Sequence, residues 1–183
     1  MPSTKREPRS KFYELLQQQI YNEFTASQQY LAIAVWFDNE DLPQLAKFFY
    51  RQSVEERNHA LAFVQFMMDT GHYVEIPGAG AVRNEFGEAI ELVELALEQE
   101  KEVTADVKTL AKIARDSDDY QGEQFMQWFL KEQVEEVARM STLLTVVNRA
   151  NGNLFEVETF LTRDAGGAAT PDPTMPRVAG GSL

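Results

Sequence analysis

The 183-residue sequence contains no cysteine and only 2 histidines. The lack of cysteine excludes disulfides, iron–sulfur clusters and thiolate metal sites, so any bound metal must take oxygen or nitrogen ligands. No apolar run approaches the roughly 18 residues that a bilayer-spanning helix needs. The basic start "MPSTKREPRSK" is followed by no apolar signal region. We therefore expect a cytoplasmic protein with no membrane partner.

Positive charge is also scarce. Lys and Arg number 17 against 29 Asp and Glu, which gives a net charge of −12. Nucleic acid is a poor partner for such a chain, because phosphate binding needs a cationic surface. The composition favours cations as ligands, although a high net charge alone also serves solubility.

Long period-two alternation is missing as well, whereas helical spacing is sustained over four long stretches. The first runs over about 10–38 with Ser10 as its cap. The second starts from Asp41 as N-cap, with Pro43 in its first turn, and stops at Gly71. The third stretch covers about 87–115, and the fourth covers about 119–148 and starts near Asp119. A short fifth helix is expected at about 153–163. We predict an all-α domain over 10–163, with a flexible N-terminal segment at 1–9 and a flexible C-terminal tail, rich in Gly, Ala and Pro, at 164–183.

The connections decide the topology. The first and third are short, which predicts two antiparallel hairpins. The middle connection, "HYVEIPGAGAVRNEF", has about 15 residues. At roughly 3.3 Å per residue it spans about 50 Å, longer than the roughly 42 Å of a 28-residue helix. We therefore predict a four-helix bundle with one long crossover and a short fifth helix.

Each of the four core stripes is apolar at its ends and polar in its middle. Glu23 and Glu56 are equally far from the turn at 38–41, and Glu100 and Gln133 are equally far from the turn at 116–119. The polar residues are therefore expected at one height, halfway along the bundle. They are Glu23, Ser27, Gln52, Glu56, His59, Glu100, Thr104, Gln133 and Glu136.

This polar layer needs a source of positive charge. The stripes contain four carboxylates but no Lys or Arg, and each isolated buried charge would cost several kcal/mol. Two divalent cations would balance the four carboxylates, and a carboxylate-rich site with one histidine suits iron or manganese. The alternatives are protonated carboxylates, or salt bridges to Arg57, Lys101 and Arg139.

These residues, with "NEFTASQQYLAIA", "QEKEV" and "FLKEQVEE" around them, resemble the bacterial non-haem ferritins of the ferritin-like di-iron family. Glutamate with Glu-x-x-His is that family's known pattern. The resemblance covers about 10–163 and implies an iron-storage ferroxidase that oxidises Fe(II) to Fe(III) with O2 or H2O2. Its implied di-iron centre holds one iron at Glu23, Glu56 and His59, with Glu56 bridging, and the second at Glu100 and Gln133.

The resemblance implies further roles. A third iron position would use glutamates beside the centre, at Glu55, Glu132, Glu135 and Glu136, although Glu55, Glu132 and Glu135 also fit a solvated helix surface. Tyr30 would hydrogen-bond to the centre or donate an electron, and it also fits a plain core position. Haem-binding bacterioferritins carry Met directly after the bridging glutamate, where this chain has Arg57, so no haem is expected.

The resemblance also implies a homo-oligomer, a 24-subunit shell that stores a ferric mineral. Leu154, Val157 and Phe160 of the fifth helix are predicted to make subunit contacts. One competing hypothesis is a di-iron oxidoreductase of the rubrerythrin or oxygenase type, although the usual rubrerythrins need cysteine and an oxygenase would normally show two Glu-x-x-His motifs. Another is a structural bundle whose polar layer sets the helix register.

Overall fold

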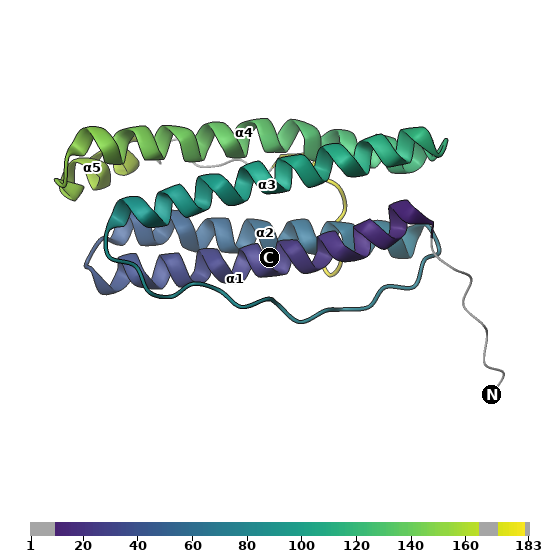
Figure 1. Ribbon diagram of the computed structural model, residues 1–183, viewed down its shortest axis with the longest axis horizontal. Coiled ribbons are helices and arrows are strands. Elements are labelled where there is room, and N and C mark those ends of the chain that lie inside the picture. The colour runs from purple at the N-terminus through teal and green to yellow at the C-terminus, as the bar shows by residue number, and fades with distance from the viewer. Residues whose placement is uncertain (1–9, 165–171, 182–183) are drawn as a thin grey trace.

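The computed structural model describes residues 10–164 and 172–181, and the expected N-terminal segment at 1–9 lies outside them. Within these ranges the chain is all-α. Four long helices form the bundle and a short one follows, as predicted (Figure 1): α1 (Lys11–Asn39), α2 (Pro43–Asp69), α3 (Ala89–Asp116), α4 (Tyr120–Ala150) and α5 (Leu154–Asp164).

The predicted crossover is present and makes α2 and α3 parallel (Figure 1). Two glutamines of α1 hold its backbone in the same way. Gln17 donates to the carbonyl of Glu75 and accepts from its N–H, and Gln29 does the same with Arg83. These paired hydrogen bonds satisfy backbone groups of a segment without secondary structure, so the long connection has a defined path.

Gly80 marks the closest approach of the crossover to α1. Its N–H donates to the Thr25 hydroxyl at 2.9 Å. A Cβ at this position would lie 2.5 Å from the Tyr21 hydroxyl oxygen. Only glycine therefore fits without a shift of α1 side chains.

The two hairpin turns share one backbone geometry. Asp41 and Asp118 both have φ near +56°. The residues after them, Leu42 and Asp119, donate their N–H groups to the carbonyls five residues earlier, at 3.0 and 2.9 Å. This is the Schellman ending of a helix, in which aspartate takes the left-handed position that glycine usually occupies. α2 ends in the same way at Gly71, as the sequence predicts.

The N-caps predicted for α1, α2 and α4 are present in part. Asp119 caps α4 by accepting from the Gly122 N–H at 2.8 Å, and Ser10 is at the N-cap of α1 but makes no side-chain capping bond. The prediction for Asp41 is wrong, because its left-handed backbone ends α1 and Leu42 becomes the N-cap of α2. The cap comes instead from Glu158 of α5, whose carboxylate accepts from the N–H groups of Gln44 and Leu45 at 2.9 and 2.8 Å.

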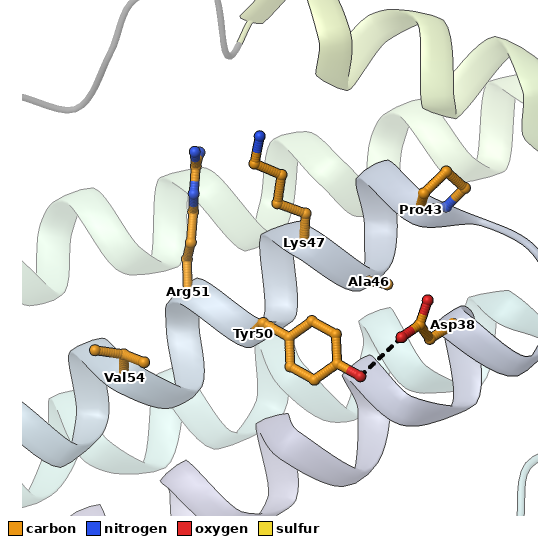
Figure 2. Close-up of a pocket in the computed structure, with 7 residues that line it drawn as sticks. All are labelled: Asp38, Pro43, Ala46, Lys47, Tyr50, Arg51 and Val54. Carbon is orange, nitrogen blue, oxygen red and sulfur yellow. Dashed lines mark hydrogen bonds between the residues drawn. The ribbon is translucent and has the colours of Figure 1, made fainter.

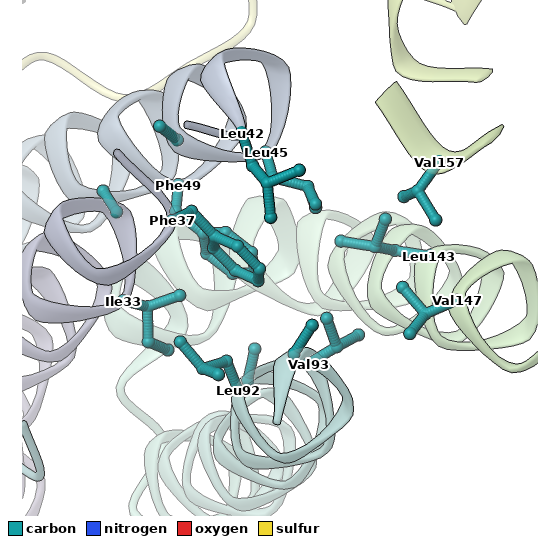
Figure 3. Packing of buried hydrophobic residues seen from close by; sticks show 14 of the residues in the cluster. Ile33, Phe37, Leu42, Leu45, Phe49, Leu92, Val93, Leu143, Val147 and Val157 are labelled. Atoms are coloured by element: carbon teal, nitrogen blue, oxygen red, sulfur yellow. The ribbon is translucent and has the colours of Figure 1, made fainter. Parts of the chain in front are cut away.

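The core is divided into two apolar clusters. The first lies toward the α1–α2 turn and α5, where Phe37 and Phe49 stack 5.6 Å apart (Figure 3). The second lies toward the α3–α4 turn, where Phe63 and Phe129 stack 4.3 Å apart. Burying large apolar side chains is the main stabilisation of such a bundle. The polar layer separates the two clusters.

Helix α5 belongs to the first cluster. Val157 is fully buried, Leu154 and Phe160 are partly buried against the cluster, and Phe155 is 79% exposed. The bundle therefore has room for the apolar face of α5, and Val157 is not free for the subunit contact predicted from the sequence. The exposed ring is Phe155, one residue away from that face.

Replacing Glu158 with Ala tests the cap that α5 supplies to α2. We expect the free energy of unfolding to fall by about 1 to 2 kcal/mol, because the first turn of α2 loses its side-chain acceptor. Chemical unfolding at one protein concentration measures the change. Glu98→Ala, which removes a 65% exposed carboxylate from α3, is the control and should change stability by less than about 0.5 kcal/mol. Equal losses in the two variants would contradict the capping role.

Candidate metal centre

The polar layer is buried and draws on all four long helices, as the sequence predicts. Six of its predicted ligands are at most 2% exposed. α1 supplies one of them, α2 two, α3 one and α4 two: Glu23, Glu56, His59, Glu100, Gln133 and Glu136. Charged and polar groups thus meet in the middle of the bundle, where water is scarce.

Glu23, Glu56 and His59 form the tightest group. Their ligand atoms all lie within 4.8 Å of one another. The His59 Nδ1 is 3.3 Å from Glu56 Oε2, and Gln19 donates to Glu23 Oε1 at 2.8 Å. The Gln19 contact orients the Glu23 carboxylate, as groups behind a metal ligand commonly do.

The second half of the centre is held by α3 and its neighbours. The Tyr30 hydroxyl donates a hydrogen bond to Glu100 Oε1. Thr104 donates to Gln133 Oε1 at 3.0 Å. Glu100 does not belong to either of the groups of close ligand atoms found within the described ranges. Glu100 is therefore less tightly gathered with the other carboxylates than Glu23 and Glu56 are.

Four ligand atoms of the layer have no hydrogen-bond partner although they are buried. They are Glu23 Oε2, Glu56 Oε1, His59 Nε2 and Glu100 Oε2; a fifth such atom in the described chain belongs to Gln99. A buried polar atom without a partner costs roughly 1 to 3 kcal/mol. Bound cations would satisfy these four atoms, so the donor set fits a metal.

The carboxylates also raise one another's pKa. Burial, followed by the charge of Glu56, holds the pKa of Glu23 well above its usual value. Burial, followed by the charge of Glu100, does the same to the pKa of Glu56. Burial raises the pKa of Glu100, although the Tyr30 hydrogen bond opposes this. The surroundings thus disfavour full ionisation of these carboxylates, which therefore hold on to protons when no cation is bound.

Glu136 differs from the other carboxylates, because both of its oxygens have partners. Arg139, one turn along α4, donates to Oε1, and Gln52 donates to Oε2 at 3.0 Å. Burial raises the pKa of Glu136, while the charge of Arg139 opposes that rise. Although the stripes contain no Lys or Arg, a cation thus reaches the layer from its flank. Of the three cations suggested as salt-bridge partners from the sequence, Arg139 thus forms an ion pair with a buried carboxylate. Among the buried carboxylates of the described ranges, its partner is Glu136.

The residues expected at a third iron position divide into two kinds. Glu55, His59 and Glu132 have ligand atoms within 4.8 Å of one another, and Glu132 is buried. Glu135 is exposed and forms its ion pair with Lys131 at 3.8 Å. The structure therefore gathers Glu55 and Glu132 beside His59 but leaves Glu135 on the surface.

Two aromatic residues flank the layer. Tyr30 is fully buried and contacts Glu100. Trp128 packs edge-on to His59 with ring centroids 5.7 Å apart, and its indole N–H donates to Asp172 at 3.0 Å. No sequence pattern points to Asp172, which belongs to the region predicted as a flexible tail.

The described part of that tail, residues 172–181, lies against α2 and α4. Beyond the Trp128 contact, the Ala179 N–H donates to the carbonyl of Leu61 at 3.2 Å. The segment borders a cavity of about 1000 Å³ whose walls include Glu55, His59 and Glu132. This cavity connects the layer to the α2–α4 surface. Residues 165–171 and 182–183 of the expected tail lie outside the described ranges.

A second pocket, on the outer surface of α2, lacks a set of metal-ligating residues (Figure 2). It measures about 410 Å³, and its polar contact is a hydrogen bond of 3.0 Å between Tyr50 and Asp38. Asp38 is its one acidic residue, beside Lys47 and Arg51. Such a lining does not provide the set of oxygen and nitrogen ligands that a metal needs.

Comparison with known proteins gives a consistent result. A model of the ferritin-like domain matches residues 13–150. Ferritin BfrB of Mycolicibacterium smegmatis is 57% identical over 174 residues, which cover 95% of this chain and 96% of that protein. Bacterioferritin BfrB of Mycobacterium tuberculosis is 56% identical over 176 residues, which cover 96% of this chain and 97% of that protein.

More distant proteins agree. The bacterial non-heme ferritin of Staphylococcus aureus is 35% identical over 136 residues, which cover 74% of this chain and 82% of that protein. An open pore ferritin from the hyperthermophilic archaeon Archaeoglobus fulgidus is 24% identical and has a TM-score of 0.81 over 85% of this chain and 96% of its own. That structure supports the fold alone. Along the described ranges, no helix is both long and apolar enough to cross a membrane.

The raised carboxyl pKa values predict how the metal-free protein responds to pH. A group with a raised pKa keeps a proton in the folded state that the unfolded chain has already lost. The free energy of unfolding therefore falls as pH rises above the ordinary glutamate pKa of 4.5. Thermal unfolding of metal-free protein between pH 5 and 8 measures the slope, which should become shallower in Glu23→Gln.

The control is Glu98→Gln. It removes the same charge from a side chain that is 65% exposed, so its slope should match that of the parent. If Glu23→Gln has the same slope as Glu98→Gln, the buried carboxylate does not cause the pH dependence.

Proposed function

This chain belongs to the ferritin-like domain family, and from that premise we propose that the buried polar layer oxidises Fe(II) to Fe(III) for storage. Iron is the substrate and the cargo of this ferroxidase reaction. The observation that carries the proposal is the set of four buried ligand atoms without partners, which come from α1, α2 and α3. Their oxygen and nitrogen chemistry suits iron.

In the proposed reaction, Glu23, Glu56 and His59 hold one Fe(II), and Glu100 and Gln133 hold the second. Each Fe(II) gives up one electron. The two electrons and two protons reduce O2 to H2O2, or H2O2 to two molecules of water. The protein contributes by holding both ions close together and by keeping the ligands fixed with Gln19, Thr104 and Tyr30.

Two other functions, a purely structural polar layer and a di-iron oxidoreductase, account for fewer of these features. A polar layer that only sets helix register would have its hydrogen bonds satisfied, whereas this one leaves four ligand atoms without partners. A rubrerythrin of the usual type needs cysteine, which this chain lacks. The family match and the similar ferritins therefore favour iron storage over a di-iron oxidoreductase acting on other substrates.

Combining Glu56→Ala with His59→Ala tests the proposed site. The double variant should oxidise Fe(II) in air at least about tenfold more slowly, because the first iron loses two of its three ligands. Stopped-flow absorbance of ferric product measures the rate. Glu98→Ala, which removes an exposed carboxylate, is the control and should match the parent. A double variant as fast as the control would show that the oxidation happens elsewhere.

We propose that 24 copies form the storage shell, because a single bundle encloses no space for a mineral. We also propose that the shell carries no haem, since Arg57 replaces the methionine that haem-binding bacterioferritins place after the bridging glutamate, although one similar protein is named a bacterioferritin. A cytoplasmic location suits a substrate that must arrive as reduced iron, and cell fractionation would test it.

The purified protein tests the assembly and the cofactor together. With a chain mass of 20.8 kDa, a 24-subunit shell should elute at about 500 kDa in size-exclusion chromatography. Its visible spectrum should show no Soret band. A small oligomer would contradict the shell, and a Soret band in proportion to the protein would contradict the absence of haem.

A further inference from the structure

Arg139 makes an unusual set of contacts beside the proposed iron site. Its Nη1 donates to Glu136 Oε1, to Gln52 Oε1 at 2.9 Å and to Glu55 Oε2 at 3.3 Å. The side chain is 37% exposed, whereas that of Glu136 is fully buried. One guanidinium nitrogen thus joins α4 to two positions of α2.

The contact with Glu136 removes that carboxylate from the set of free ligands. Its second oxygen accepts from Gln52 at 3.0 Å, so neither oxygen is without a partner. Glu23, Glu56 and Glu100 each keep one free oxygen. Charge-assisted hydrogen bonds to arginine are among the stronger ones, so Arg139 offsets part of the negative charge that Glu136 would offer to a metal and fixes the orientation of its carboxylate.

The contact with Glu55 creates a competition. Glu55 is also a member of the group with His59 and Glu132, whose ligand atoms lie within 4.8 Å of one another. The Glu55 carboxylate can therefore pair with Arg139 or help to bind a metal ion at that group. A divalent cation there would also meet the positive charge of the guanidinium, and like charges at close range weaken each other's binding.

We propose that Arg139 is a positioning residue that keeps a metal position at Glu55 and Glu132, beside His59, weak. By holding Glu55 and Glu136, it divides the layer into a tight pair of iron positions and a third position that an ion occupies only briefly. Iron then passes through the third position instead of staying there. The inference depends on the proposed function, because it assumes that the layer binds iron.

Arg139→Gln tests this role. Anaerobic titration of the assembled protein with Fe(II) alone, followed by calorimetry, gives the number of ions per chain and their affinities. The parent should show two tight ions and one weak ion. In Arg139→Gln the weak ion should bind about tenfold more tightly, because a nearby like charge is gone and Glu55 is released.

Two further variants separate the causes. Lys131→Gln removes one positive charge from the same helix, but Lys131 contacts Glu135 and Asp172, so its third affinity should match that of the parent. Arg139→Lys keeps a charge for the buried Glu136, which protects the fold, but its shorter and more flexible side chain does not keep the fixed geometry with which the guanidinium reaches both carboxylates. Its third affinity should rise by about threefold.

The outcomes are distinct. An unchanged third affinity in both Arg139 variants overturns the inference, and so does an equal rise in Lys131→Gln. Those results leave the two tight ions, and with them the proposed function, intact. A parent protein that binds no tight Fe(II) overturns the proposed function itself.

Discussion

The structure depends on the repulsion among carboxylates that are buried without enough positive charge. Glu23, Glu56 and Glu100 meet in a layer between two apolar clusters, and each keeps an oxygen without a hydrogen-bond partner. Apolar packing on both sides fixes the height of this layer, because the aromatic stacks above and below cannot slide past one another without losing contact. The clusters thus hold the ligands in place, and cations would relieve the strain that this placement creates.

The two hairpins contribute unequally to the layer. The α1–α2 hairpin supplies Glu23, Glu56 and His59, which are close together and have free ligand atoms. The α3–α4 hairpin supplies Glu100, a neutral carboxamide at Gln133, and Glu136, which Arg139 and Gln52 already occupy. If both hairpins supplied the same ligands, the two ions would bind with equal affinity. Here the difference between the hairpins arises from one amide and one arginine, both on α4.

The sequence predicts those parts of the molecule that depend on local spacing. Helix ranges and the height of Glu23, Glu56, His59 and Glu100 follow from helical periodicity and from distance to a turn. It fails where a partner comes from far along the chain. The cap of α2 is not Asp41 but Glu158, more than a hundred residues away, and Asp172 contacts Trp128 from a region without any periodic pattern. Arg139 is one of the salt-bridge partners that the sequence suggests, but spacing alone cannot select Glu136 and Glu55 from the neighbouring glutamates.

The unequal layer has a consequence for iron that moves on to storage. A carboxylate set balanced for two Fe(II) ions faces two more positive charges once both are oxidised, so its affinity for the product is limited by the ligand charge that remains available. The neutral Gln133 and the Arg139-bound Glu136 both reduce that available charge on the α4 side. The cavity that reaches His59 and Glu132 opens between α2 and α4. The proposed weak binding and the cavity thus lie on the same side of the bundle, which is the arrangement expected of a site that releases its product.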